Sequence, residues 1–156
     1  MNARSQSAFH LEGRVMSEIV YEGHIDGWFY GFDDGAIFKT ADGTYWRQVN
    51  FRYWEYEKFE PKVVIENVDG MLMMTVGGET EQVERLEAVR EVEIDGEFVG
   101  FNGTKRYRLA NGETWEEYGY RYKYRHAFDP EAIIVRVGEA TLLNVKGLHA
   151  RVHRVE

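Results

Sequence analysis

Hydrophobic and polar residues follow one another in short segments whose period is that of a β-strand. Such segments, at 25–32, 36–40, 44–53, 62–68 and 71–76, are separated by positions rich in Gly, Asp and Asn. No stretch of useful length has the 3.6-residue period of an amphipathic helix. The pattern predicts an all-β protein whose short antiparallel strands are joined by tight turns.

The strand pattern occurs twice. The sequence IDGWFYGF, which begins at Ile25, reappears as IDGEFVGF from Ile94, an offset of 69 residues. Without a gap, the same offset pairs tryptophan with tryptophan, proline with proline and one Arg-Tyr dipeptide with another. Residues 25–86 are thus duplicated as residues 94–155, which indicates two copies of one structural unit.

The duplication divides the chain into a disordered leader (1–17), a first β repeat (18–86), a short linker (87–93) and a second β repeat (94–156). Each copy has five or six predicted strands, which favours a small antiparallel Src-homology-3-like barrel, with a small β-sandwich as the alternative. Because so small a barrel is marginally stable alone and the linker is short, we expect the two copies to pack on each other.

Each copy also contains a dipeptide typical of a hairpin turn. Asp42-Gly43 lies between the second and third predicted strands of the first copy, and Asn111-Gly112 lies at the same place in the second. Both dipeptides suit a type I′ turn, because both central residues of that turn need a positive φ. We therefore expect a two-residue hairpin at each site.

A row of tyrosines alternates with cations in YGYRYKYRHAF (118–128). Its counterpart in the first copy, VNFRYWEYEKF (49–59), keeps the hydrophobic and aromatic positions, whereas only Arg52 keeps a cation, matching Arg121. We interpret the aromatic row as the core face of a strand and the basic row as its solvent face. Tyrosine suits this arrangement because its ring can be buried while its hydroxyl reaches water.

The tryptophans complicate this interpretation. Trp46 and Trp115 have the opposite strand parity from the aromatic row. A β-bulge at Asn50 and Gly119 would bring tryptophan and tyrosine to the same side of the strand. We favour this bulge over the alternative, in which both tryptophans are exposed in a binding groove.

Composition restricts the classes of function. The 156 residues are 44% hydrophobic and 15% aromatic, which is enough for a core, and the formal net charge of −8 disfavours nucleic-acid binding by the chain as a whole. The absence of cysteine excludes disulfides, thiolate catalysis and cysteine-ligated zinc. No apolar run approaches the ~20 residues of a membrane span, and the N-terminus lacks the apolar core of a secretory signal. We expect a soluble cytoplasmic protein with no membrane association.

Candidate chemistry is sparse. His149 and His153 have a spacing compatible with a metal site on a helix, but on a strand we interpret them as a surface pair in the last strand. Asp26 and Asp95 each precede a glycine and are better explained as turn-capping side chains than as general acids. Serine occurs only within the first 17 residues. We therefore expect no catalytic residue, no metal and no cofactor.

The two copies differ in charge. The first copy (25–86) has twelve acidic and six basic side chains, a net charge of −6, and the second (94–155) has eight and ten, a net charge of +2. The divergence suggests that the copies face different partners, although neutral drift explains it equally well.

The function favoured by these observations is non-enzymatic recognition of a protein or peptide through an aromatic patch. The alternative is a single-stranded nucleic-acid-binding module in which the basic strand of the second copy contacts phosphates; an enzyme with a site between the copies is a third hypothesis. Homo-oligomerisation stays open. The expected binding residues are Trp46, Tyr53, Trp54, Trp115, Arg121, Tyr122, Lys123, Tyr124 and Arg125.

The assembled motif is I-x-G-x-F-x-G, then [DN]-G-x-x-W, then [FY]-R-Y, then P-x-x-x-I. In the second copy it reads IDGEFVG, NGETW, YRY and PEAII. This motif resembles a short repeat found, often at chain ends or in tandem, in bacterial proteins of no assigned function. The resemblance covers both copies and implies a bacterial β-repeat protein, and it supplies no catalytic residues.

Overall fold

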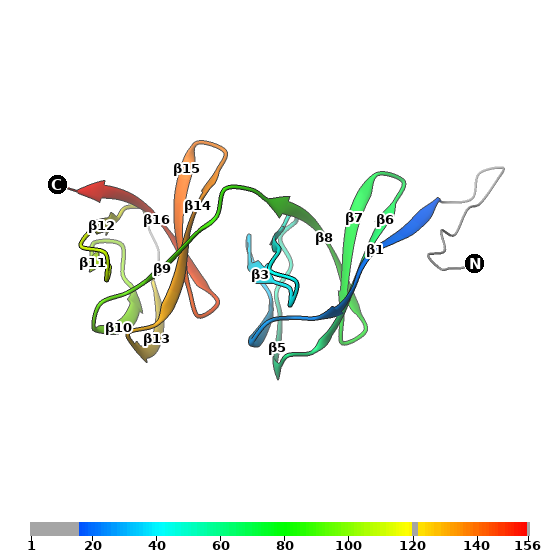
Figure 1. The fold of residues 1–156 in the computed structure, drawn as a ribbon, viewed down its shortest axis with the longest axis horizontal. Helices are drawn as coiled ribbons and strands as arrows, with labels where there is room; N and C mark the ends of the chain where they lie inside the picture. Colours follow the sequence, from blue (N-terminus) through cyan, green and yellow to red (C-terminus); the bar gives the residue numbers. More distant parts are fainter. Residues whose placement is uncertain (1–15, 120–121, 156) are drawn as a thin grey trace. The chain divides into compact units, whose positions relative to one another are not determined.

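A computed structural model of the protein describes residues 16–119 and 122–155. These residues form strands, turns and loops, and the chain divides into two compact units between Arg85 and Leu86 (Figure 1). The prediction of an all-β protein with two tandem small β domains is confirmed. In the part of the chain that is described, no helix is long and apolar enough to cross a membrane.

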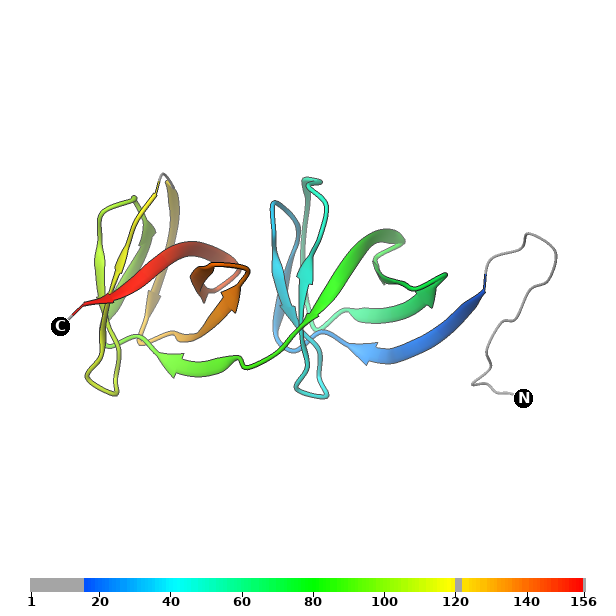
Figure 2. The same cartoon turned by 90° about the horizontal axis from the view of Figure 1, so that it is seen from above.

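Unit 1 contains a six-stranded antiparallel sheet and a two-stranded ribbon. The sheet has the order β1-β6-β7-β8-β4-β3, and the ribbon pairs β2 with β5 (Figure 2). The strands are β1 (Ser17–His24), β2 (Trp28–Phe32), β3 (Ile37–Lys39), β4 (Tyr45–Gln48), β5 (Trp54–Phe59), β6 (Lys62–Val68), β7 (Met71–Val76) and β8 (Glu79–Leu86).

Unit 2 repeats this topology. Its sheet has the order β9-β14-β15-β16-β12-β11, and its ribbon pairs β10 with β13. Each strand from β10 to β16 begins and ends 69 residues after its counterpart in unit 1, so the expected common topology is confirmed. The strands are β9 (Arg90–Glu93), β10 (Glu97–Phe101), β11 (Arg106–Arg108), β12 (Thr114–Glu117), β13 (Lys123–Phe128), β14 (Glu131–Val137), β15 (Ala140–Val145) and β16 (Leu148–Val155).

The segment expected to be a linker, 87–93, supplies a strand of unit 2. Val92 of β9 is opposite Ala132 of β14, as Gly23 of β1 is opposite Val63 of β6. The linker prediction is wrong for these residues because a four-residue strand carries too little alternation to be recognised without its partner. The expected leader lies outside the described residues except for its last two positions, the second of which begins β1.

The two predicted hairpins form at the expected places with a different turn. Gly43 has a φ of 89°, whereas Asp42 does not have a positive φ. The N–H of Gly43 donates to the carbonyl of Thr40 at 2.9 Å, and the N–H of Thr40 donates to the carbonyl of Thr44 at 2.9 Å. This is a three-residue loop with a single left-handed glycine, so the type I′ prediction is wrong. The loop at Gly112 has the same hydrogen bonds.

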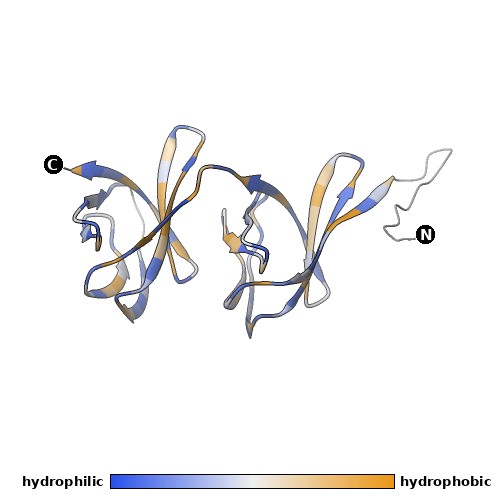
Figure 3. Ribbon diagram, viewed as in Figure 1, coloured by the Kyte–Doolittle hydropathy of each residue, from blue (hydrophilic) through white to orange (hydrophobic). Residues whose placement is uncertain are grey.

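Each unit has its own hydrophobic core, and Figure 3 shows the alternation of hydrophobic and hydrophilic residues along the strands. Residues that face inward from the sheet pack against the ribbon. The core of unit 1 contains Ile25, Phe29, Phe32, Ala36, Phe38, Trp46, Val63, Ile65, Met74, Val76 and Val83. The core of unit 2 contains Ile94, Phe98, Phe101, Tyr107, Leu109, Trp115, Ala132, Ile134, Leu143, Val145, Ala150 and Val152.

A glycine in each ribbon allows its two strands to approach closely. Gly31 and Gly100 have φ values of 99° and 117°, and each lies at a shift in the strand register. A Cβ atom would lie 1.9 Å from the carbonyl oxygen of Trp54 at Gly31 and 2.0 Å from that of Lys123 at Gly100. This contact explains why the glycine before the final phenylalanine recurs in both copies.

Candidate functional site

The two tryptophans expected in a contact patch are core residues. Trp46 on β4 and Trp115 on β12 are only 3% and 8% exposed. Their indole N–H groups donate to Thr40 Oγ1 and Glu113 Oε1, each at 3.0 Å. The assignment of Trp46 and Trp115 to a binding surface is therefore wrong.

The strands that carry these tryptophans end sooner than predicted. β4 ends at Gln48 and β12 at Glu117, both buried and on the same inward side as the tryptophan two residues earlier. Among the described residues, neither strand extends past these positions into the aromatic residues that follow. The long strand predicted for 44–53 is wrong, and so is the β-bulge predicted at Asn50 and Gly119.

The aromatic row lies beyond these strand ends and is exposed. Phe51 and Tyr53 are 72% and 63% exposed in unit 1, and Tyr118 and Tyr122 are 40% and 84% exposed in unit 2. The prediction that this row is a core face is wrong, because strand alternation no longer directs side chains inward once the ladder has ended. Arg121 lies outside the described residues.

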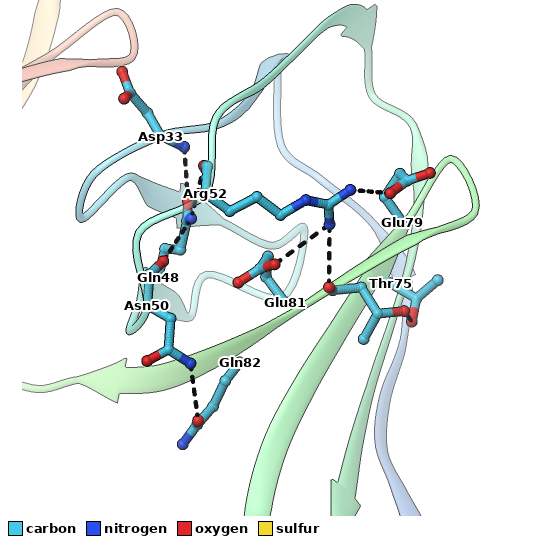
Figure 4. A network of polar contacts seen from close by, with 9 residues as sticks. Asp33, Gln48, Asn50, Arg52, Thr75, Glu79, Glu81 and Gln82 are labelled. Atoms are coloured by element: carbon cyan, nitrogen blue, oxygen red, sulfur yellow. Dashed lines mark hydrogen bonds and ion pairs between the residues drawn. The ribbon is translucent and has the colours of Figure 1, made fainter.

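Gln48 ties the exposed loop of unit 1 to the body of the unit. Its side chain is completely buried. Its Oε1 accepts a hydrogen bond from the N–H of Asp33 at 2.8 Å, and its Nε2 donates to the carbonyls of Asn50 and Arg52 at 2.8 and 3.1 Å (Figure 4). A buried amide with partners for both of its polar atoms holds the backbone of the loop in place.

Arg52 fastens the same loop to β8. Its guanidinium group pairs with Glu79 and, at 3.3 Å, with Glu81, and it donates to the carbonyl of Thr80 at 3.4 Å (Figure 4). The guanidinium carbon also lies 5.6 Å from the centroid of the Phe32 ring. The hydrogen bond to Glu79 is the main cause that raises the pKa of Arg52. The loop therefore presents its two aromatic side chains from an anchored backbone.

Trp54, which we also expected in the patch, covers the core instead of standing free. Its ring is half-buried and stacks on Tyr56, with centroids 4.6 Å apart and an interplanar angle of 11°. It also leans on Phe32, with centroids 5.3 Å apart. Only part of the indole surface is left for contact with a ligand.

An exposed aromatic pair that the sequence analysis missed lies on the ribbon of unit 1. Trp28 on β2 and Phe59 on β5 are 52% and 56% exposed, and their rings meet edge to face at 5.3 Å. Glu97 stands at the place of Trp28 in unit 2, where it pairs with His126 at 2.8 Å. Glu97 could have revealed this exposure in the sequence, because a position that accepts glutamate in one copy faces water in both copies.

The expected binding residues of β13 lie on two sides of the strand. Tyr124 is 73% exposed. Lys123 and Arg125 stand at positions whose unit 1 counterparts, Trp54 and Tyr56, cover the core. Because side chains alternate along a strand, the cationic row and the exposed tyrosine face opposite sides.

A buried polar pair in unit 2 also escaped the sequence analysis. Glu117 is 3% exposed and accepts hydrogen bonds from the Tyr107 hydroxyl at 2.6 Å, from the N–H of Asn102 at 3.2 Å and from the N–H of Gly103. The same hydroxyl lies 2.7 Å from the carbonyl oxygen of Gly100. Burial and then the hydrogen bond to Glu117 raise the pKa of Tyr107 well above its ordinary value.

The corresponding pair in unit 1 is uncharged. Gln48 takes the place of Glu117, and Phe38 takes the place of Tyr107. An ionised glutamate only accepts hydrogen bonds, so it needs the donor that tyrosine supplies, whereas glutamine carries donors and acceptors of its own. The two positions have therefore changed together between the copies.

The two histidines of the last strand are not a surface pair. His149 is 9% exposed and lies opposite Asn144 of β15, whereas His153 is exposed, with Nε2 3.3 Å from Glu116. The surface-pair prediction is wrong for His149, because its side chain is buried while that of His153 faces water. Among the described residues there is no group of three or more side chains that could hold a metal ion.

Comparison of the chain with protein-family models, with curated proteins and with solved structures finds no match.

Proposed function

We propose that the protein is a non-enzymatic binding module that recognises a protein or peptide through exposed aromatic side chains. The observation that carries the proposal is the exposure of large aromatic residues beyond corresponding strands of both units, Phe51 and Tyr53 in unit 1 and Tyr122 in unit 2. Exposed aromatic clusters are costly in water and are enriched at protein interfaces.

The anchoring of the unit 1 loop supports this function. Gln48 and Arg52 hold the loop backbone by side-chain hydrogen bonds, so little conformational freedom is lost when a ligand binds. The exposed pair of Trp28 and Phe59 adds a second aromatic surface to the same unit.

We place the protein in the cytoplasm, in keeping with a chain that has no cysteine.

Selection of peptides by the purified protein tests the proposal. A displayed library of random twelve-residue peptides is panned on the full chain, and the affinities of the enriched peptides are measured by fluorescence anisotropy. Two double variants, Phe51→Ser with Tyr53→Ser and Tyr122→Ser with Tyr124→Ser, each remove two exposed aromatic side chains from one unit. We expect at least one of them to weaken binding about tenfold or more, the effect of losing a central aromatic anchor.

Met71→Ser provides a matched control, because it removes a 46% exposed hydrophobic side chain from a different surface, the start of β7. We expect this variant to bind as the wild type does. The proposal fails if panning enriches no peptide, or if both aromatic double variants retain wild-type affinity with unchanged thermal midpoints.

A further inference from the structure

Unit 1 covers one end of its ribbon with an aromatic stack. Trp54 and Tyr56 are two residues apart on β5, and their rings stack on the same side of the strand. Both rings lie against the turn between β7 and β8, where Gly77 has a φ of 59°. A Cβ atom at Gly77 would lie 3.0 Å from the Tyr56 ring and 3.1 Å from the Trp54 ring. The stack therefore favours glycine at this turn position.

Unit 2 has cations at all three corresponding positions: Lys123, Arg125 and Lys146, here called the basic cluster. Arg125 donates a hydrogen bond to the carbonyl of Lys146, which joins β13 to the turn between β15 and β16. Lys123 and Lys146 are exposed and Arg125 is half-buried. Lys146 has a φ of 51°, and that left-handed backbone disfavours a side chain by roughly 1 kcal/mol. A lysine at a place where glycine fits better points to a use for its charge.

Two acidic side chains of unit 1 have uncharged counterparts in unit 2. Glu79 and Glu81 pair with Arg52 in unit 1, whereas Leu148 and Ala150 occupy their places in unit 2.

The three cluster positions and these two acidic positions together change in net charge from −2 in unit 1 to +3 in unit 2. This change accounts for five of the eight charge units that separate the copies, whose net charges are −6 and +2. Much of the divergence in charge is thus concentrated at these five positions.

We propose that the basic cluster binds an extended acidic peptide segment with carboxylates at alternate positions. The inference rests on the proposed protein- or peptide-binding function and names the class of partner that unit 2 selects. Lys123 and Arg125 are two residues apart on a strand, so their side chains leave it about 7 Å apart, the spacing of alternate side chains in an extended peptide. Lys146 adds a third cation from the adjoining turn.

The strand that carries the cluster is also suited to an extended ligand. Among the described residues, β13 pairs with β10 alone in a two-stranded sheet. A second extended chain can therefore align along its other edge, where main-chain hydrogen bonds supply affinity and alternate side chains supply specificity. Arg125 can hold a carboxylate through two parallel hydrogen bonds.

Single-stranded nucleic acid fits this surface less well. Phosphate contacts and base stacking work together when cations and aromatic rings share one groove. Here Tyr124 faces the side of β13 opposite to Lys123 and Arg125, so a strand held by the cations does not reach that ring. The chain's net charge of −8 also opposes a dense polyanion more strongly than a peptide with separated carboxylates.

Fluorescence anisotropy with the full chain tests this assignment. The probes are a labelled peptide of six Glu-Thr repeats, the same peptide with glutamine for glutamate, and an oligothymidine of equal negative charge. The test variant combines Lys123→Gln, Arg125→Gln and Lys146→Gln. The control variant removes three cations of unit 2 elsewhere, by Arg106→Gln, Arg108→Gln and Arg136→Gln, and so has the same net charge as the test variant.

We expect the wild type and the control variant to bind the glutamate peptide at least about tenfold more tightly than the glutamine peptide. We expect the test variant to lose this preference. Binding of the glutamate peptide should also weaken between about 50 mM and about 200 mM salt, as charge-dependent association does. A thermal scan of each variant checks that it is folded, and Lys146→Gln alone, at an exposed turn, provides a milder variant in which part of the preference is lost.

Three results would overturn the assignment. Equal binding of the two peptides removes the requirement for carboxylates, and equal losses in the test and control variants indicate non-specific attraction. Tighter binding of the oligothymidine that depends on the cluster assigns the site to nucleic acid instead. If library peptides bind through the aromatic residues but none of these charge effects occurs, the peptide-binding function stands and only the acidic preference is rejected.

Discussion

Replacement of Tyr107 by phenylalanine should destabilise unit 2 and leave unit 1 unaffected. The Tyr107 hydroxyl is a buried donor 2.6 Å from the carboxylate of Glu117, which is 3% exposed. A hydrogen bond to a charged group contributes about 1.5–3 kcal/mol, and its loss leaves one oxygen of a buried carboxylate less well satisfied. We expect a loss of about 2 kcal/mol in the unfolding free energy of unit 2. In a domain of this size that loss lowers the thermal midpoint by about 8–16 °C.

A double-mutant cycle combines Tyr107→Phe with a second substitution, Glu117→Gln. Alone, it replaces a charged acceptor by a neutral one and should cost about 1 kcal/mol. Combined with Tyr107→Phe, it installs the side chains that unit 1 already uses, Gln48 and Phe38. The double variant should therefore be more stable than the sum of the single losses implies, by a coupling energy of about 1–2 kcal/mol.

Fluorine NMR of 5-fluorotryptophan-labelled protein measures both units in one denaturant titration. The chain has four tryptophans, of which Trp115 is the only one in unit 2. Its signal reports unfolding of unit 2, and the Trp46 signal provides the internal control for unit 1. The reasoning is refuted if Tyr107→Phe leaves the Trp115 midpoint unchanged, or if the two substitutions are simply additive.

Two further predictions concern unit 2. Gly100→Ala should lower the unfolding free energy by at least about 3 kcal/mol, because its Cβ would lie 2.0 Å from a backbone carbonyl oxygen. Gly112→Ala should lower it by only about 1–2 kcal/mol, because the φ of 93° is unfavourable for alanine but no atom lies close to the added Cβ. Equal urea midpoints for the two variants would contradict this prediction. Because the pKa of Tyr107 is raised in the folded protein, the stability that its hydroxyl contributes is complete below the ordinary pKa of 10.0. That contribution is lost as the pH rises above 10.0, because the hydroxyl then ionises in the unfolded chain but not in the folded one. The stability difference between wild type and Tyr107→Phe, measured by denaturant titration from pH 8 to pH 11.5, should therefore be constant up to about pH 10 and shrink above it; a difference that grows in alkali would contradict the assignment.

Strand positions could be predicted from the sequence because they depend on local alternation and on the repeat. The two segments predicted as strands at 62–68 and 71–76 coincide with β6 and β7. The short strand β9 could not be predicted, because only its pairing with β14 marks it as a strand. Likewise, Asp42-Gly43 indicated a hairpin, but the hydrogen bond between Thr40 and Thr44 sets its loop length.

A 69-residue offset and a two-residue period are properties of the linear order, so the residues alone establish a duplicated all-β chain. Which aromatic residues are core and which are surface depends on the folded arrangement of the strands. Trp46 and Phe51 are both large aromatic residues in the sequence, but Trp46 lies within β4 and is buried, whereas Phe51 follows the end of β4 and is exposed. Alternation places side chains only while a ladder of hydrogen bonds continues, and the ladder depends on partners far away in the chain. The basic cluster could not be predicted from the sequence either. Lys146 lies beside Lys123 and Arg125 only because the folded chain places the turn between β15 and β16 next to β13.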